Sequence, residues 1–125
     1  MLSSLIKSAD WKTEKHVPVI AAPEVARAGE PFEVEVSVGK EIPHPNTLEH
    51  HIVWAALYFV ADGSQLPVEL ARAEFRAHGP DLFTSPTLKA TVSLPTSGTL
   101  HATASCNIHG LWEAERKIPV ERAES

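Results

Sequence analysis

Cysteine is nearly absent from this chain, since Cys106 is the only one among 125 residues. An intrachain disulfide is therefore excluded, and so is the Cys-x-x-Cys-His sequence that attaches haem. Structural zinc sites usually take two or more cysteines, which this chain does not have. The only methionine is Met1, so the weak axial methionine of many blue copper sites is missing as well. A single unpaired cysteine is typical of a reducing compartment, and we expect a cytoplasmic protein.

Long apolar runs and basic clusters are also missing. The longest apolar stretch, residues 52–61, is well short of the ~20 residues needed to cross a bilayer. The net charge is −5 and no run of five basic residues occurs, so neither a membrane nor a nucleic acid is expected as a partner. The first ten residues do not have the pattern of a secretory signal. From the length we expect one domain over residues 1–125.

Proline and glycine interrupt the sequence too often for long helices, with ten prolines and six glycines. Between them, apolar and polar residues alternate with a period of two, which predicts strands with one buried face. Residues 53–60 are apolar on both faces, so this strand should be central. The predicted strands are 17–21, 32–38, 53–60, 68–77, 88–94, 100–106 and 111–120. They favour an all-β fold, a seven-stranded immunoglobulin-like antiparallel β-sandwich without the disulfide of that fold.

Three separated segments carry residue types that bind metal ions. Residues 14–18 read Glu-Lys-His-Val-Pro, residues 43–51 read Pro-His-Pro-Asn-Thr-Leu-Glu-His-His, and residues 106–113 read Cys-Asn-Ile-His-Gly-Leu-Trp-Glu. Two prolines flank His44 and stiffen the second segment into a loop. Cys106 ends the apolar face of a predicted strand, so a short turn would bring His109 to the same ion. The pattern predicts a metal site carried by loops.

Not every histidine in the chain is expected to bind this ion. His50 and His51 are neighbours, and neighbouring residues of a strand point to opposite faces. Only one of the two should reach the ion, and their spacing does not decide which. His78, beside a Gly-Pro turn, and His101, on a polar strand face, are interpreted as ordinary histidines. Four imidazoles and one thiolate fit neither structural zinc nor blue copper, and they leave a sixth position open on a non-haem iron.

The three segments resemble the ligand motifs of superoxide reductases of the one-iron neelaredoxin type, in the desulfoferrodoxin iron-binding domain family. The resemblance runs from Asp-Trp-Lys at residues 10–12 to Trp-Glu at residues 112–113. It selects His50 rather than His51 as a ligand. It implies that Glu14 occupies the sixth position of the oxidised iron and that Lys15 is the cation beside this position. The other implied ligands are His16, His44, His50 and His109 around the iron and Cys106 on its axis.

The resemblance also implies an activity, the one-electron reduction of superoxide to hydrogen peroxide without release of oxygen. One iron per chain would cycle between Fe2+ and Fe3+. An electron donor such as rubredoxin would reduce it again, and the chain would form a homotetramer. Two alternatives stay open, iron-dependent superoxide dismutase activity and a non-catalytic electron-transfer iron protein. Glu14 and Lys15 favour catalysis, since simple electron transfer would not need them.

Overall fold

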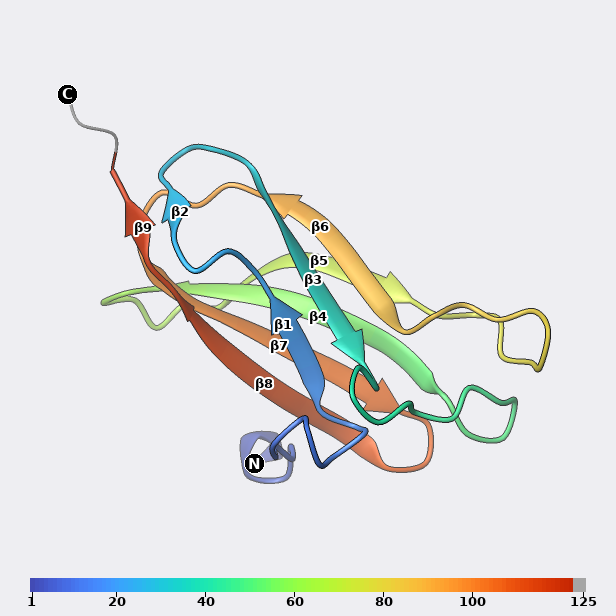
Figure 1. The fold of residues 1–125 in the computed structure, drawn as a ribbon. Helices are drawn as coiled ribbons and strands as arrows, with labels where there is room; N and C mark the ends of the chain where they lie inside the picture. Colours follow the sequence, from blue (N-terminus) through green and yellow to red (C-terminus); the bar gives the residue numbers. More distant parts are fainter. Residues whose placement is uncertain (123–125) are drawn as a thin grey trace.

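The computed structural model describes residues 1–122, which form two β-sheets packed face to face (Figure 1). Within these residues no helix is long and apolar enough to cross a bilayer. The described elements are a 3-10 helix, η1 (Leu2–Ser4), and nine strands, β1 (Pro18–Ala21), β2 (Ala26–Arg27), β3 (Phe32–Val38), β4 (Ile52–Ala61), β5 (Val68–Glu74), β6 (Thr87–Val92), β7 (Gly98–Cys106), β8 (Gly110–Ile118) and β9 (Val120–Glu121).

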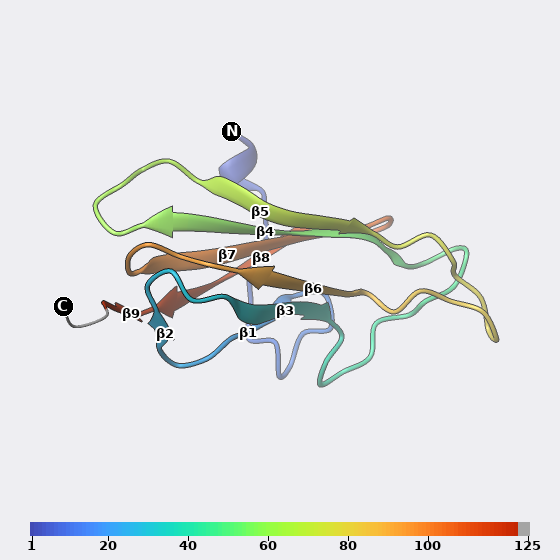
Figure 2. The same ribbon diagram turned by 90° about the horizontal axis from the view of Figure 1, so that it is seen from above.

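The two sheets have the strand orders β1-β3-β6 and β5-β4-β7-β8, with antiparallel neighbours throughout. Figure 2 shows them edge-on as two layers. This confirms the predicted all-β antiparallel sandwich. The predicted number of seven strands was too low, because β2 and β9 form an additional parallel pair. Each of these has two residues, too few for an alternation to be read from the sequence.

Alternating burial builds the core between the layers. In β7 every second residue is buried, from Gly98 to Cys106, as the period of two predicts. β4 lies between β5 and β7, which confirms its predicted central place. The strand predicted over residues 68–77 ends earlier, at Glu74, because the register places this residue opposite Trp54, close to the start of β4.

Six strand termini that matter for function lie at one end of the sandwich. β3 ends and β1 begins there, with Val38 paired to Pro18. β7 ends and β4 begins there as well, with Cys106 paired to Ile52. β8 and β6 also start at this end, at the lower right of Figure 1. Antiparallel pairing thus brings segments that are far apart in the sequence to one place.

Candidate metal centre

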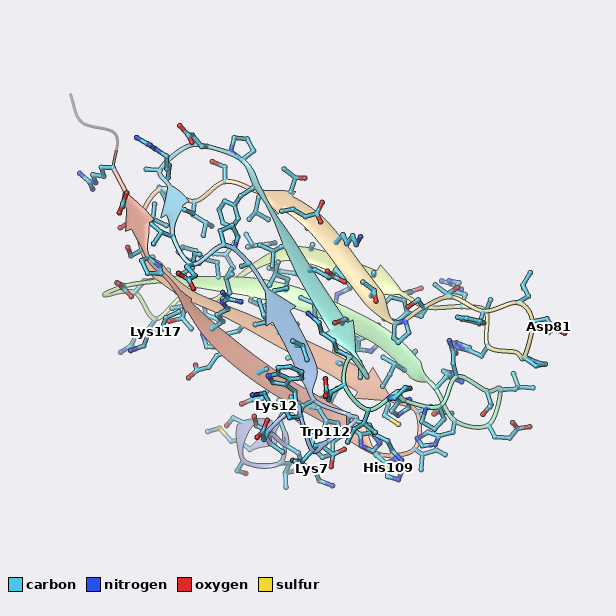
Figure 3. The ribbon with its side chains drawn as sticks, viewed as in Figure 1. Lys7, Lys12, Asp81, His109, Trp112 and Lys117 are labelled. Atoms are coloured by element: carbon cyan, nitrogen blue, oxygen red, sulfur yellow. The ribbon has the colours of Figure 1, made fainter. Side chains whose placement is uncertain are left out.

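The three segments predicted to bind a metal meet at this end of the sandwich. His16 lies two residues before β1, and His44 and His50 lie in the loop between β3 and β4. Cys106 is the last residue of β7, and His109 lies in the turn that leads to β8. Figure 3 shows His109 in this turn, with Trp112 nearby on β8.

Four imidazole rings form a closed circuit. Going round from His16 to His44, His50, His109 and back to His16, the ring centroids are 4.8, 4.6, 4.9 and 4.6 Å apart. His16 and His50, across the circuit, are 6.1 Å apart. Neighbouring rings meet edge to face, at 61–77°. This square of imidazoles is the arrangement expected of four ligands around one ion.

The thiol of Cys106 lies next to this circuit. Its Sγ atom is 3.7 Å from Nδ1 of His109. One donor atom each from His16, His50, Cys106 and His109 lies within 4.8 Å of the others. Ligands that hold one ion at about 2.0–2.3 Å can be at most about 4.6 Å apart. The donor atoms are therefore close to the spacing that a shared ion requires.

The ring nitrogens of the circuit show which atoms are available to a metal. His44 Nδ1 is 2.7 Å from the carbonyl oxygen of Pro45, and His16 Nδ1 is 2.6 Å from Oε1 of Glu14. Both oxygens only accept hydrogen bonds, so each Nδ1 carries the proton and each Nε2 has a free lone pair. Such an oxygen acceptor on the far ring nitrogen is usual for histidines that bind metals.

Several donor atoms in the circuit lack a proper partner within the protein. Nε2 of His44 and Nε2 of His50 are buried, and the described residues offer neither a hydrogen bond. His16 Nε2 lies 3.0 Å from Nδ1 of His109, from which it accepts a hydrogen bond when that Nδ1 carries the proton. Buried polar groups normally have partners. The two orphaned nitrogens of His44 and His50, together with the soft sulfur of Cys106, fit a transition-metal ion such as iron.

The turn from β7 to β8 depends on Gly110. Cys106 pairs with Gly110, so three residues form the turn, and Gly110 has a φ of 77°. A three-residue hairpin loop with glycine in the left-handed region is a common form. It explains how the chain returns His109 to the sulfur of Cys106 within three residues, although His109 stays exposed to solvent.

Burial and Lys15 disfavour the charged forms of His44 and His50. Burial lowers the pKa of His44 to about 4 and also lowers the pKa of His50. The positive charge of Lys15 adds to both effects. The hydrogen bond from His16 lowers the pKa of Glu14, and Lys15 adds to this as well. At neutral pH, His44 and His50 are thus free of the protons that would compete with a metal.

Comparison with known proteins agrees with this geometry. Residues 8–115 match the desulfoferrodoxin family. The chain belongs to the desulfoferrodoxin family. It is 53% identical to the superoxide reductase of Pyrococcus horikoshii, over 94% of this chain and 99% of that protein. It is 41% identical to the neelaredoxin of Megalodesulfovibrio gigas, over 96% and 98% of the two chains. The reduced neelaredoxin structure from Archaeoglobus fulgidus superposes with a TM-score of 0.84, at 47% identity over 92% and 98% of the chains.

Within this desulfoferrodoxin centre the structure separates His50 from His51. The ring of His50 belongs to the circuit, whereas the ring of His51 stacks on His78, with centroids 3.5 Å apart. His101 lies on β7, with its Nδ1 3.8 Å from the carboxylate of Glu115. These three histidines thus lie outside the circuit, in agreement with the interpretation from the sequence.

Glu14 and Lys15 lie beside the circuit. The Oε1 atom of Glu14 contacts both Nδ1 and the backbone N–H of His16, the latter at 3.1 Å. Lys15 is half-buried. Together with Thr13, His16 and Ile42, these two residues line an open depression of about 370 Å3. A small anion can therefore approach the circuit past Lys15.

The sequence did not indicate how Trp112 takes part. Its indole stacks on the ring of His16, with centroids 5.0 Å apart and planes at 13°. Lys7 pairs with Trp112 through an isolated β-bridge, and its Nζ lies 5.6 Å from the indole centroid. Figure 3 shows these two residues side by side at the metal end. The presence of Trp112 in the motif that follows Cys106 was the signal that could have indicated this stacking. Its partner, His16, lies far away in the sequence.

Proposed function

We propose that this protein is a superoxide reductase, which reduces superoxide to hydrogen peroxide by one electron. The observation that carries the proposal is the circuit of four imidazoles beside the thiol of Cys106, with orphaned nitrogens in its buried interior. Relatives in the desulfoferrodoxin family that are about half identical over nearly the full chain bear this name.

In this proposal one iron ion per chain is held by His16, His44, His50, His109 and Cys106. The iron would supply the electron that, together with two protons, converts superoxide to hydrogen peroxide, by passing from Fe2+ to Fe3+. The thiolate of Cys106 would donate electron density to this centre, as a cysteine ligand does in some haem enzymes. These five protein donors would leave room for one small ligand.

Lys15 would attract the substrate. The chain has a net charge of −5, so an anion needs a local positive potential to approach. The charge of Lys15 reaches the circuit, because it contributes to the lowered pKa values of Glu14, His44 and His50. We propose that Lys15 guides superoxide through the depression and stabilises negative charge while protons arrive.

Glu14 would have two roles. Its carboxylate accepts the Nδ1 proton of His16 and thereby turns the lone pair of Nε2 toward the circuit. We also propose, from the resemblance to the family, that Glu14 occupies the sixth position of the oxidised iron. To do so its carboxylate would have to leave Nδ1 of His16, so the two roles would belong to different states of the centre.

Four further features belong to the same proposal. Residues 1–125 would form one domain, four copies would assemble into a homotetramer, and the protein would work in the cytoplasm. A small redox protein such as rubredoxin would supply the electron that reduces the iron again.

Metal analysis combined with visible spectroscopy tests the proposal. We expect about one iron per chain and an oxidised form coloured by charge transfer from Cys106 to ferric iron, which reduction bleaches. Cys106→Ser should abolish the band. Superoxide should yield hydrogen peroxide without oxygen, whereas release of oxygen would indicate a dismutase. Tightly bound zinc in protein from iron-replete cells, with no visible band on oxidation, would refute the proposal.

A further inference from the structure

Asn107 joins the two loops that carry the neighbouring ligands His50 and His109. Its Nδ2 donates to the carbonyl oxygen of Glu49 at 3.0 Å, and its Oδ1 accepts from the backbone N–H of His51 at 2.9 Å. Its own backbone N–H donates to the carbonyl oxygen of His51 at 3.1 Å. Asn107 directly follows Cys106, and the two residues it grips directly flank His50.

The contacts of Asn107 lie next to an irregularity in the pairing of β4 with β7. The pairing of β4 with β7 shifts between Ile52 and Trp54, because Val53 is an extra residue on β4. Such a bulge disrupts the ladder locally and bends the strand. Beyond it, the regular β4–β7 ladder ends with the pair Ile52 and Cys106. The hydrogen bonds of Asn107 continue the connection past the bulge.

The other side-chain hydrogen bonds of the loop that carries His50 lie within the loop or join Asn46 to Thr84 and His78. Thr47 donates its backbone N–H to the carbonyl oxygen of His50 at 3.0 Å, and its Oγ1 accepts from the N–H of His50 at 3.1 Å. These bonds shape the loop but do not attach it to β7. Among the described residues, Asn107 makes the side-chain hydrogen bonds that join this loop to the end of β7, beside the pair Ile52 and Cys106.

We propose that Asn107 is a positioning residue that sets the separation of His50 and Cys106 at the metal centre. The proposal rests on the proposed function, because it assigns Asn107 to the geometry of that same site. Asn107 itself is exposed and belongs to neither the imidazole circuit nor the depression beside it. It would act through the ligands, by keeping two loops in register.

The other end of β7 offers a matched control. Ser97 directly precedes β7, as Asn107 directly follows it. Its Oγ accepts from the N–H of Val120 at 2.7 Å and donates to the carbonyl oxygen of Val120 at 3.3 Å. Ser97 therefore also ties two segments through two side-chain hydrogen bonds, but far from the metal centre.

The test compares Asn107→Ala, Asn107→Ser and Ser97→Ala with wild type, each as the metal-loaded protein. Release of iron to a chelator and the charge-transfer band are measured together with the urea midpoint. We expect both Asn107 variants to release iron about 10–100-fold faster, the effect typical of groups that orient metal ligands, and to shift the band. Ser97→Ala should lower the urea midpoint but leave the band and the release rate unchanged.

Cobalt(II) bound to the metal-free proteins gives a second readout that does not require iron. Its ligand-field bands should shift in both Asn107 variants and remain in Ser97→Ala. Failure of the proposed function would be seen in wild type, as absence of iron. Failure of the positioning proposal would be seen as unchanged metal release and unchanged bands in the Asn107 variants, or as equal changes in Ser97→Ala.

Discussion

We expect Gly39 to be essential for placing His44. Its replacement by alanine would have two effects, the cost of a positive φ and a steric clash with the backbone of His44. Gly39 directly follows β3 and has a φ of 83°. A Cβ atom there would lie 2.5 Å from the backbone nitrogen of His44, whereas ordinary contact begins at 3.4 Å. Because the obstructing atom belongs to the backbone, no side-chain rotation can relieve the clash. The segment that carries His44 has to move.

Gly29 provides the matched control. It has a φ of 76°, and a Cβ atom there would meet no atom within 4 Å. Gly29→Ala should therefore lower the free energy of unfolding only by the cost of holding alanine in the left-handed conformation, about 1–2 kcal/mol. Gly39→Ala should cost this amount and the displacement of the His44 segment in addition, about 3 kcal/mol or more in total.

Urea unfolding of the metal-free proteins measures these costs, and iron analysis measures the consequence for the centre. We expect Gly29→Ala to keep a full complement of iron and Gly39→Ala to lose most of it. The reasoning would be refuted if both variants unfolded with equal free energies and both retained iron. It would then follow that the loop after β3 adjusts without moving His44.

Three further predictions concern charge, pH and packing. Lys15→Met should keep the iron and its colour but slow the reaction with superoxide roughly ten-fold and weaken the salt dependence of its rate. Pulse radiolysis at several salt concentrations measures both effects. Equal rates and equal salt dependence in the two proteins would contradict this. Burial lowers the pKa of His44 to about 4 from 6.5, so the unfolded chain binds a proton that the folded chain rejects. The free energy of unfolding of the metal-free protein should therefore be highest above pH 6.5 and fall as the pH drops toward 4, because the unfolded state gains protons at His44. The urea midpoint of His44→Gln should depend less on pH than that of wild type. Leu57→Ala removes a fully buried side chain and should cost about 2–5 kcal/mol, whereas Leu66→Ala, at an exposed position, should stay within about 0.5 kcal/mol in the same unfolding assay.

The strands illustrate what a local pattern can predict. The alternation in Phe32–Val38 matched β3 at both ends, because one buried face leaves a mark at every second residue. The end of β5 was misplaced, since an edge strand stops where its partner stops and this depends on the register. β2 and β9 were missed because a two-residue pair has no period.

The choice between His50 and His51 shows a different limit. Strand alternation predicted that only one of the two rings would reach the ion, but both residues lie in the loop before β4, where alternation does not apply. In the structure His50 joins the circuit and His51 stacks on His78. This arrangement involves the loop after β3 and the hydrogen bonds of Asn107 to Glu49 and His51. The spacing of residues in the sequence does not reveal these contacts.

The sequence by itself determined the seven longer strands, the candidate donor residues and the resemblance to a family, because periodicity and residue chemistry are written locally along the chain. Only the tertiary structure decided how the donors meet. Antiparallel pairing brings the end of β7 to the start of β4, and the turn at Gly110 returns His109 to Cys106. Burial then removes competing protons, and Glu14 and the carbonyl of Pro45 turn two lone pairs inward. These effects depend on distances between segments, which arise only when the two sheets pack.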